Sequence, residues 1–581
     1  MQLKFFNLFL SFLKTIKSFG LLLDKEDKKK AFYMFSLIIV GTFLEMLSIS
    51  IIFPVIQIVL NENFINEYPS LNLLKTHLNF TKNSLIIYIL ILFLIIFFIK
   101  NAFLTFIIIY KAKFIELLRN KLSKKLHLKY LGKNYNFFIN THTSELIRNL
   151  HQEIPKIIKG IDGILVLITE ILILIGISVV LLYISPVSTA IIITFTLIIF
   201  LIYIFVTKKK VLIMGKKDQV LFSKLLKETQ QGYGNFKEIL IYQLKDTFVY
   251  QYTNILVDYC RNNRILSIYQ QFPRVLFEQV GIFLIIGISI FILFYEPEKT
   301  KAIGIIGLYA YAFFRLLPSI NKLVVNIQLI IFVKPSVDII NAEFESKKEK
   351  DLIIDNNEPI DFKEEITVEN LSFATEFNHK ILENINLKIK KNSKIGIIGQ
   401  TGSGKSTLLN IIMGLLEPTS GTIKIDKKTL INSSVLWKKK ISFVSQSAYL
   451  LDESIINNIT FNQSESLIDK KKLYEAIKIA NLDEFIEKSQ FKLETIVGER
   501  GSKISGGELQ RICIARAIYR ESEVLVFDEF TSALDEKTEI EIINNIFNLE
   551  KTIIIASHKA QTLKYCDDIY EIVNRQLKKK Q

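Results

Sequence analysis

GQTGSGKST, which runs from Gly399 to Thr407, is the stretch of sequence that decides how this chain folds. It follows the apolar run Lys394 to Ile398 and precedes the apolar segment Leu408 to Leu416, a pattern that predicts a strand, a glycine-rich turn and a helix. In such a turn, the backbone N–H groups and the N-terminus of the helix point at phosphate oxygens. Because the full spacing and its strand and helix context are both present, the pattern indicates an ATP site rather than a glycine loop that only turns the chain.

Each residue type in this loop suits a triphosphate and a magnesium ion. Gly399, Gly402 and Gly404 let the backbone wrap around the phosphates where a Cβ would clash. Lys405 supplies a positive charge to the β- and γ-phosphates, and Ser406 offers its hydroxyl to Mg²⁺. The predicted nucleotide-binding residues of the loop are Gly399, Gln400, Thr401, Gly402, Ser403, Gly404, Lys405, Ser406 and Thr407.

Length and composition divide the chain in two. Its 581 residues are too many for one domain, and the long apolar runs lie almost entirely in the first part, which predicts a membrane domain followed by a soluble one. The net charge of +16 could suggest a nucleic-acid partner, but there is no basic module interleaved with aromatic residues, so we predict none. Cys260, Cys513 and Cys566 have neither metal-ligand spacing nor even pairing, which predicts free thiols in a reducing compartment.

The predicted order is an N-terminal amphipathic helix in residues 1–30, a transmembrane domain in 31–340, a linker in 341–365 and a nucleotide-binding domain in 366–581. Lysines interrupt the apolar N-terminal residues at Lys4, Lys14 and Lys17, which fits a helix lying in the membrane interface. A signal peptide is the competing interpretation. The linker is charged and poor in apolar residues, whereas strand and helix patterns alternate after it, as in an α/β domain.

Six segments are long enough to cross about 30 Å of hydrocarbon. We place them near residues 31–60, 84–110, 161–184, 187–206, 273–295 and 302–333. The segments 111–160 and 207–272 are helical in pattern and rich in Lys and Arg, so the spans are expected to continue as helices into the cytosol. Their bends, near Phe137 to Glu145 and near Gln231 to Ile239, are predicted to touch the soluble part. Residues 64–80 form either a short amphipathic helix on the outer surface or a plain loop.

Two further motifs complete the predicted ATP site. Val524 to Phe527 is an apolar strand that ends in Asp528, which is placed to hold Mg²⁺ through water, and Glu529, which is placed to orient or deprotonate the attacking water. Ile504 to Glu508, ISGGE, opens a helix and offers a second cradle for phosphate. One chain does not easily bring both cradles to one γ-phosphate, but two chains can.

These motifs, in this order, resemble those of an ABC exporter half-transporter, a membrane all-α six-helix exporter domain followed by an α/β P-loop nucleotide-binding domain. The resemblance covers the whole chain and implies a homodimer in which ATP lies between the P-loop of one subunit and the ISGGE loop of the other. It further implies that Gln446 contacts Mg²⁺ and water and that His558 acts as the switch. The loop VGERG, Val497 to Gly501, resembles a loop of exporters and favours outward transport.

The roles implied by the resemblance extend to the following residues. The catalytic set is Glu529, His558 and Gln446. The metal set is Ser406, Gln446 and Asp528. The second cradle and the loop beside it contribute Ser505, Gly506, Gly507, Glu508 and Asp535.

The sequence departs from the family pattern at two places. The second cradle has Ile504 in place of the usual leucine and Glu508 in place of the usual glutamine, which are mild changes. Relatives stack an aromatic ring on adenine where this chain has Thr375, so Phe373 and Phe377 are the alternative stacking residues.

Ionisable residues inside predicted spans are candidates for function because they are costly there. These residues are Glu45, Lys100, Glu170, Arg274, Glu278 and Arg315. We counted the rise per residue along each span from its assumed outer end. By this count, Arg315, Lys100 and Arg274 lie in the cytosolic half of the membrane, where they suit an inward-facing cavity that captures an anion such as phosphate. The alternatives are an Arg274 to Glu278 pair on one helix, a Lys100 that snorkels, and acids that serve packing.

Four short stretches, around Glu45, Glu170, Arg274 and Arg315, are similar to the bacterial lipid-linked oligosaccharide flippases of the PglK type. This resemblance implies a flippase in the inner (plasma) membrane that moves a polyprenyl-pyrophosphate-linked oligosaccharide from the inner to the outer leaflet. Arg315 and Arg274, together with Lys100, would hold the pyrophosphate while the prenyl tail stays in lipid. The alternatives are export of a hydrophobic peptide, drug or other lipid, a non-transport ABC ATPase acting on DNA or ribosomes, and an ABC-gated channel.

Overall fold

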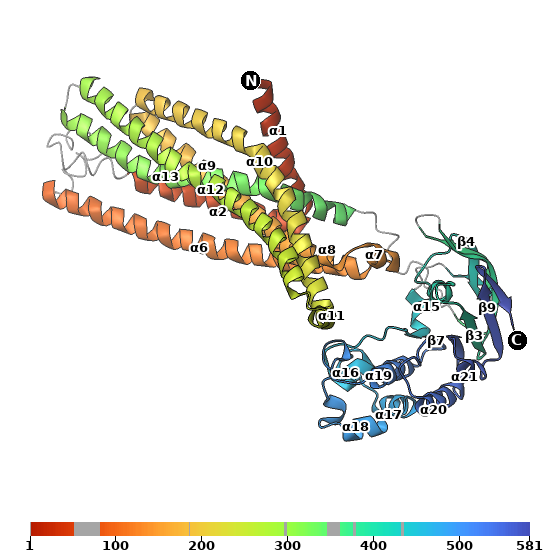
Figure 1. Cartoon of the computed structure of the whole chain (residues 1–581). Coiled ribbons are helices and arrows are strands. Elements are labelled where there is room, and N and C mark those ends of the chain that lie inside the picture. The colour runs from red at the N-terminus through yellow and green to blue at the C-terminus, as the bar shows by residue number, and fades with distance from the viewer. Residues whose placement is uncertain are drawn as a thin grey trace. The chain divides into compact units, whose positions relative to one another are not determined.

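The computed structural model describes residues 2–50, 82–184, 186–295, 299–345, 361–375, 379–430 and 435–580. The chain forms two compact units, one made of Met1–Lys133 with Thr141–Lys348 and the other of Asn134–Asn140 with Glu349–Gln581 (Figure 1). The short segment Asn134–Asn140 therefore groups with the second unit. The predicted outer segment 64–80 and Phe377 lie outside the described residues.

The first unit is entirely helical in its described part, with helices that run alongside one another (Figure 1). Among the described residues, six helices are long and apolar enough to cross a membrane, in agreement with the predicted number. The elements of the segment up to residue 345 are α1 (Gln2–Leu21), α2 (Lys25–Ser50), α6 (Lys82–Leu131), α7 (Tyr135–Asn140), α8 (Thr143–Arg148), the π-helical turn η1 (Asn149–Glu153), α9 (Ile154–Ile184), α10 (Pro186–Gly234), α11 (Phe236–Ile241), α12 (Lys245–Tyr295) and α13 (Lys299–Glu345).

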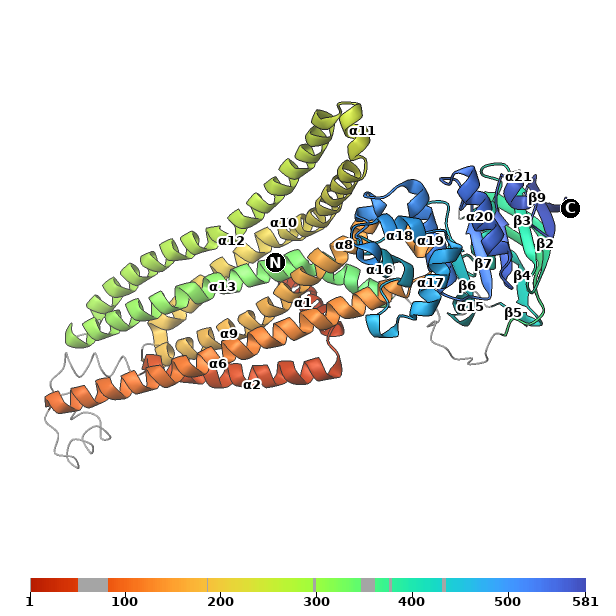
Figure 2. The same cartoon turned by 90° about the horizontal axis from the view of Figure 1, so that it is seen from below.

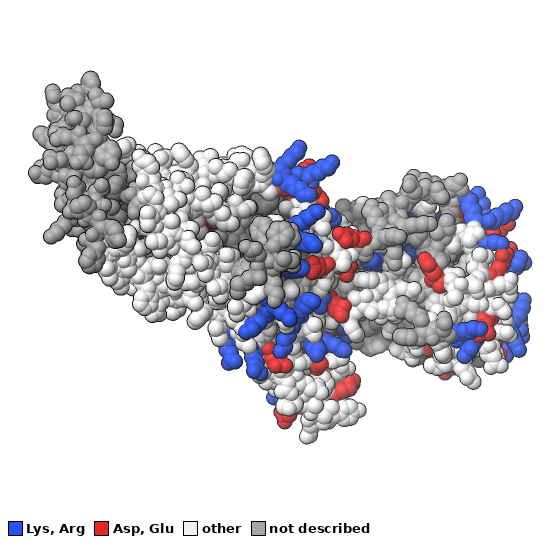
Figure 3. All heavy atoms as spheres, turned by 90° about the horizontal axis from the view of Figure 1, so that it is seen from above, with Lys and Arg blue, Asp and Glu red and all other residues white. Residues whose placement is uncertain are grey.

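The helices continue far beyond the apolar stretches, as the sequence predicts. The span predicted at 84–110 belongs to α6, which ends at Leu131, and the span predicted at 187–206 belongs to α10, which ends at Gly234. The expected bends are confirmed too, since α7 and α8 follow α6 and the short α11 joins α10 to α12 (Figure 2). In Figure 3 the middle of this unit is almost free of charge, and Lys and Arg gather where the helices leave the apolar stretch.

The N-terminal helix α1 packs into this unit. Phe19 is buried, and a Cβ added at Gly160 of α9 would lie 2.8 Å from its ring. Asn341 of α13 donates a side-chain hydrogen bond to the carbonyl oxygen of Ser18, at 3.0 Å. The predicted helix is therefore present as an integral part of the fold, whereas its position in the membrane interface stays a prediction.

A buried network of charged and polar side chains joins the helices at the π-helical turn η1. Glu153 is fully buried and accepts a hydrogen bond from Gln219 of α10 at 3.0 Å. Lys156 of α9 lies 2.5 Å from the buried Asp218 of α10. Two acids and two bases thus neutralise one another inside the bundle, because Arg148 also lies 3.7 Å from Glu153. A π-helical turn adds a residue to the helix without breaking it, and such turns are concentrated at functional sites.

Close backbone packing fixes the same helices beside the network. A Cβ added at Gly215 of α10 would lie 2.1 Å from the backbone oxygen of Phe332 of α13, so any larger residue would push the two helices apart. Ser336, one turn further along α13, lies within 3.5 Å of Gln219. Glycine packing and the charged network therefore determine the position of α10 against α13 at one level of the bundle.

The second unit is an α/β domain built on two sheets. The antiparallel sheet has the order β2-β1-β4-β5, made of β1 (Glu365–Ala374), β2 (Lys380–Lys390), β4 (Ser420–Ile425) and β5 (Lys428–Thr429). The larger sheet has the order β10-β9-β3-β8-β7-β6, made of β3 (Lys394–Gly399), β6 (Ile441–Val444), β7 (Val524–Asp528), β8 (Thr552–Ala556), β9 (Asp568–Val573) and β10 (Gln576–Lys579). Every residue of β7 and β8 is buried, as expected for parallel strands covered on both faces.

Helices cover the larger sheet and bury two apolar clusters, one between the antiparallel sheet and α14, the other around α19 and α20. The helices of this domain are α14 (Lys405–Ile412), α15 (Val435–Lys439), α16 (Ile455–Thr460), α17 (Lys470–Ile479), α18 (Asp483–Lys488), α19 (Gly506–Tyr519), α20 (Glu536–Phe547) and α21 (Ala560–Leu563), with 3₁₀ turns η2 (Glu465–Leu467), η3 (Lys492–Glu494) and η4 (Glu499–Gly501). The predicted fold class, a membrane all-α six-helix domain followed by an α/β P-loop domain, is confirmed.

The network at η1 generates a stability prediction. Replacing Asp218 by Leu leaves Lys156 without its nearest carboxylate, and breaking a buried ion pair on one side costs about 3 to 5 kcal/mol. We expect a shorter half-life at elevated temperature for the purified Asp218→Leu protein, measured by loss of the monodisperse peak in size-exclusion chromatography. The double variant Asp218→Leu/Lys156→Met removes both charges and is expected to recover most of that loss. A double variant as unstable as the single one would show that the unpaired charge of Lys156 is not the cause of the shorter half-life.

Candidate functional site

The carboxyl ends of four neighbouring parallel strands meet at one edge of the larger sheet. The strands β3, β8, β7 and β6 are adjacent, and their registers pair Ile397 with Ala556, Ala556 with Asp528, and Phe527 with Val444. The loops that follow these strands carry the P-loop, His558, Glu529 and Gln446, respectively. Parallel strands thus bring together side chains that are far apart in sequence, at the edge where α/β sheets bind ligands.

Lys405 lies beneath the P-loop. Its Nζ donates hydrogen bonds to the backbone oxygens of Gly399, at 2.8 Å, and Gln400, at 3.2 Å. The side chain is buried, and this burial lowers the pKa of Lys405 against the opposing effect of the neighbouring carboxylates Glu529 and Asp528. The ammonium group is therefore held by the loop at the point where the strand ends and the helix begins.

Glu529 lies at the centre of the site. Its carboxylate accepts a hydrogen bond from Gln446 Nε2 at 2.7 Å, lies 2.8 Å from His558 Nε2 and lies 3.8 Å from Lys405 Nζ. The backbone of Glu529 has a φ of +46°, a left-handed conformation that is uncommon for a residue with a side chain. Its N–H donates to the backbone oxygen of Ala556 at 2.9 Å, which ties this strained turn to β8. Backbone strain of this kind is concentrated at functional sites.

Asp528 and Ser406 form the other half of the site. The Ser406 hydroxyl donates a hydrogen bond to the Asp528 carboxylate. Burial raises the pKa of Asp528, and the neighbouring charge of Glu529 raises it further, while Ser406 and Lys405 act in the opposite sense. An exposed hydroxyl in contact with a buried carboxylate offers oxygen ligands of the kind that Mg²⁺ prefers, so Ser406 and Asp528 fit such an ion.

The P-loop has the shape that a phosphate chain requires. Gly402 has a φ of +81°, and a Cβ built on it meets no atom within 4 Å, so its outer side is open. Gly404 has a φ of +103° and precedes α14 as its N-cap. The Oγ of Ser403 is buried without a hydrogen-bond partner in the described part of the chain. Because an orphaned buried hydroxyl is costly, this loop fits a ligand that supplies acceptor oxygens.

The second cradle is built by a capping box. The side chain of Ser505 accepts a hydrogen bond from the N–H of Glu508 at 3.3 Å, and the N–H of Ser505 donates to the Glu508 carboxylate at 2.8 Å. A capping box accepts Glu or Gln at this position, which explains why Glu508 can replace the usual glutamine. Asp535 caps α20 by accepting from the N–H of Thr538 at 3.0 Å.

Gln510 joins α19, the helix that the second cradle opens, to the loop that follows β7, and the sequence did not single it out. Its Nε2 donates to Ser532 Oγ at 2.8 Å, and its Oε1 accepts from the N–H of Ala533 at 3.0 Å. Gly507 lies close to this segment, since an added Cβ would stand 3.2 Å from the Ala533 oxygen. A polar residue one turn inside an apolar helix was the available signal, but the sequence does not show what it contacts.

The proposed adenine-stacking residues are placed as follows. Phe373, in β1, packs against the apolar cluster below the antiparallel sheet. Thr375 donates its N–H to the backbone oxygen of His379 at 3.0 Å and is half-buried. Neither position supplies an exposed aromatic ring, and Phe377 lies outside the described residues.

The predicted anion-binding cations lie on three helices of the first unit, and the structure gives each a different setting. Arg315 of α13 forms an ion pair with the buried Glu45 of α2. Lys100 of α6 is buried and lies 4.0 Å from the centroid of the Phe97 ring. Arg274 of α12 is exposed, and in the described part of the chain no ion pair joins it to Glu278.

Lys322 is a fourth cation that the sequence reading missed. It lies on α13, seven residues after Arg315, and its Nζ is 2.7 Å from the carboxylate of Glu170 on α9. Glu170 is buried, and its second oxygen has no partner in the described part of the chain. The spacing of two helical turns from Arg315 was the signal that could have found Lys322.

Together, the fold and the site define a membrane protein with a fused nucleotide-binding domain. The model of the ABC transporter transmembrane region matches residues 31–300, and the ABC transporter model matches residues 382–532. The chain therefore combines an ABC transporter transmembrane region with an ABC transporter ATP-binding domain, and six of its described helices are long and apolar enough to cross a membrane.

Curated relatives share part of this chain. It is 36% identical over 241 residues to the alpha-hemolysin translocation ATP-binding protein of Escherichia coli O157:H7, covering 41% of this chain and 33% of the relative. It is 36% identical over 231 residues to the beta-(1→2)glucan export ATP-binding/permease protein of Bartonella bacilliformis, covering 38% of each. It is 33% identical over 231 residues to the ATP-dependent lipid A-core flippase of Syntrophus aciditrophicus, covering 39% of this chain and 38% of the relative. The chain thus spans about a third of the length of these relatives.

The fold is similar along nearly the full length to a bacterial Atm1-family ABC exporter solved with ATP bound. The TM-score is 0.78, the sequence identity is 17%, and 95% of each chain is covered. This likeness concerns the fold alone.

The raised pKa of Asp528 leads to a prediction on stability and pH. An acid with a raised pKa in the folded state destabilises the protein as pH rises from its ordinary value to the raised one, because the folded state holds the proton longer. We therefore expect Asp528→Asn to raise the apparent melting temperature at neutral pH, measured without nucleotide or magnesium. The gain should vanish toward pH 4, where the wild-type carboxyl is protonated as well. A gain that persists unchanged at that pH would contradict burial of charge as its cause.

Proposed function

We propose that the chain is an ATP-driven flippase or exporter that moves a polyprenyl-pyrophosphate-linked oligosaccharide from the inner to the outer leaflet. It would work as a homodimer in the cell inner (plasma) membrane, with its nucleotide-binding domain in the cytoplasm. The observation that carries this proposal is the pair of cations on α13, Arg315 and Lys322, each bound to a buried carboxylate of another helix.

These ion pairs suit an anionic lipid because its pyrophosphate can exchange with a carboxylate. Arginine binds phosphate oxygens through its planar fork, and lysine binds them as a point charge. When a pyrophosphate takes over the two cations, the carboxylates of Glu45 and Glu170 would stay buried without them. This burial costs free energy and opposes substrate binding, so the substrate can be released again. The names of two relatives, a glucan exporter and a lipid A-core flippase, are consistent with a carbohydrate or lipid cargo.

In the ATP-binding domain, the arrangement supports hydrolysis of ATP by water. Lys405 and the N–H groups of the P-loop would hold the phosphates, while Ser406, Asp528 and Gln446 would hold Mg²⁺, which neutralises phosphate charge when bound. Glu529 is placed to orient or deprotonate water, with His558 and Gln446 fixing its carboxylate. The capped ISGGE helix would complete the site of a second copy, and this supports the homodimer.

Export of a hydrophobic peptide, drug or other lipid is the second candidate. One relative is named as a hemolysin translocator, which favours a protein or peptide cargo for that relative. Such a cargo would not need the cations of α13, and this difference decides between the two candidates.

The first test is hydrolysis together with lipid movement. Purified protein in liposomes is expected to move a fluorescent polyprenyl-pyrophosphate oligosaccharide when ATP is added. Glu529→Gln should lower ATP hydrolysis by about 10²- to 10⁴-fold, the usual contribution of a positioned base, and should stop the movement. Hydrolysis by the wild type without any glycan movement would refute the glycan as cargo and redirect the search to peptides and other lipids.

The second test concerns the anion site. Arg315→Ala should abolish glycan movement, and Arg315→Lys should restore only part of it, because lysine keeps the charge but lacks the fork. Arg261→Ala, which removes an exposed arginine of α12, serves as the control and should move glycan as the wild type does. Unaltered movement by Arg315→Ala would remove this residue from the proposed mechanism.

A further inference from the structure

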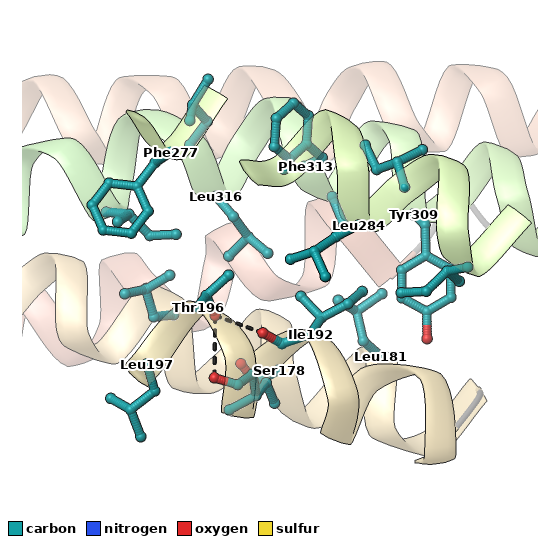
Figure 4. Close-up of a pocket in the computed structure, with 18 of the residues that line it drawn as sticks. Ser178, Leu181, Ile192, Thr196, Leu197, Phe277, Leu284, Tyr309, Phe313 and Leu316 are labelled. Carbon is teal, nitrogen blue, oxygen red and sulfur yellow. Dashed lines mark hydrogen bonds between the residues drawn. The ribbon is translucent and has the colours of Figure 1, made fainter. Parts of the chain in front are cut away.

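A cavity of about 520 Å³ lies inside the first unit, between α9, α10, α12 and α13 (Figure 4). Leu181, Phe277, Leu284, Phe313 and Leu316 are among the side chains that face it, and none of its lining residues is charged. Neither Arg315 nor Lys322 contributes to the wall, although both belong to α13.

Two hydroxyl groups of the cavity wall, those of Thr196 and Tyr309, form hydrogen bonds within the protein. Thr196 Oγ1 donates to the backbone oxygens of Ile192, at 2.7 Å, and Ile193, at 3.1 Å, as the dashed lines of Figure 4 show. The hydroxyl of Tyr309 lies 2.7 Å from the hydroxyl of Thr189. Ser178 and Ser289 are the other hydroxyl-bearing side chains of the wall, so a polar ligand would lose its hydration for few hydrogen bonds, whereas apolar surface gains by leaving water.

The cavity runs from the surface of the bundle to its interior. On α9, the lining side chains of Ile175 and Val179 are each 56% exposed, while those of Tyr309 and Ala312 on α13 are 4% and 1% exposed. The rim belongs to helices long and apolar enough to cross a membrane, so in a bilayer it would lie at the depth of the hydrocarbon. A flexible apolar chain can enter through such a rim without first crossing water.

Helix α13 places this cavity next to the ion-paired cations. Tyr309, Phe313, Leu316, Ile320 and Leu323 line the cavity and follow the three- and four-residue spacing of one helical face. Arg315 and Lys322 lie on α13 roughly 120° to 140° around the helix from that face, at 3.6 residues per turn. One helix thus presents an apolar cavity on one face and, at the same level along its axis, a pair of cations that point well away from that face.

We propose that this cavity binds the hydrocarbon chain of the transported lipid while the cations of α13 bind its phosphate-bearing head. The inference rests on the proposed function and changes one part of it, because the sequence predicted that the prenyl tail stays in bulk lipid. Binding of the tail gives the protein a hold on the apolar part of the substrate. It also favours lipids with one long, slender chain over cargo whose apolar surface is broad and rigid.

The test is photo-cross-linking of the full chain in lipid nanodiscs. The probe is a polyprenyl phosphate that carries a diazirine in its chain, and a phosphatidylcholine with a diazirine in one acyl chain serves as the bulk-lipid comparison. After irradiation, mass spectrometry locates the modified peptides. We expect the polyprenyl probe to label the lining segments of α9, α10, α12 and α13 in preference to phosphatidylcholine. Equal labelling by both lipids, or polyprenyl labels confined to other surfaces, would overturn the proposal.

A matched pair of variants sharpens this test. Thr196 lines the cavity, and Thr194, on the same helix, is exposed outside it, yet both hydroxyls donate to the backbone oxygen four residues earlier. Thr196→Phe places a ring in part of the cavity and is expected to weaken polyprenyl labelling about tenfold, from the loss of burial for a few methylene groups. Thr194→Phe adds the same ring outside the cavity. This variant should be labelled by the probe, hydrolyse ATP and move lipid as the wild type does. Full labelling of a monodisperse Thr196→Phe protein would refute the inference.

The outcome of this test is separate from that of the proposed function. If the polyprenyl probe labels the cavity while liposomes show no ATP-dependent movement of glycan, the chain-binding inference stands and the proposed cargo fails. If glycan moves but the cavity is never labelled, the flippase stands and the tail lies elsewhere.

Discussion

The alignment of four parallel strands is the constraint on which the ATP site depends. Residue pairs across β3, β8, β7 and β6 bring the ends of these strands to the same level. Each strand then ends in a loop that contributes one group around Glu529. A slip of one residue in β7 would turn Glu529 to the other face of the sheet and separate it from Gln446 and His558. The complete burial of β7 and β8 opposes such a slip, so the apolar core of the domain determines the geometry of its chemistry.

The membrane unit meets a different constraint, which is the cost of charge in an apolar bundle. Glu45, Glu170 and Glu153 are buried, and each lies beside a cation of another helix or helical turn. Such pairs add little net stability compared with apolar residues, although removing one partner is destabilising. Such pairs therefore fit the proposed exchange with an anionic substrate better than a role in stability. Two levels of paired charge, one along α13 and one at η1, join helices of the first unit.

The sequence predicted the elements that depend on local pattern. Six apolar helices, the long helical extensions, the bends and the strand, turn and helix around the P-loop follow from periodicity and from motifs whose spacing has one structural meaning. Lys405, Glu529, Gln446 and His558 were found because each stands in a motif. Pairings between distant residues were not predicted, since the sequence shows which face of a helix carries Arg315 but not that Glu45, 270 residues earlier, lies opposite. The contacts of Lys322 and Gln510 and the cavity beside Tyr309 were missed for the same reason. They arise only when helices and loops from distant parts of the sequence pack together.

The three cysteines of the chain have very unequal surroundings. Cys513 is buried and Cys566 is partly buried in the ATP-binding domain, and burial raises the pKa of both thiols, that of Cys566 to about 12. Cys260 is exposed on α12, in the long stretch between α11 and the apolar part of that helix. Thiolates, not thiols, react with maleimides and related reagents. The native protein thus offers one accessible handle for a spin label or fluorophore, so distances across a dimer could be followed through the transport cycle without removing or adding a single cysteine.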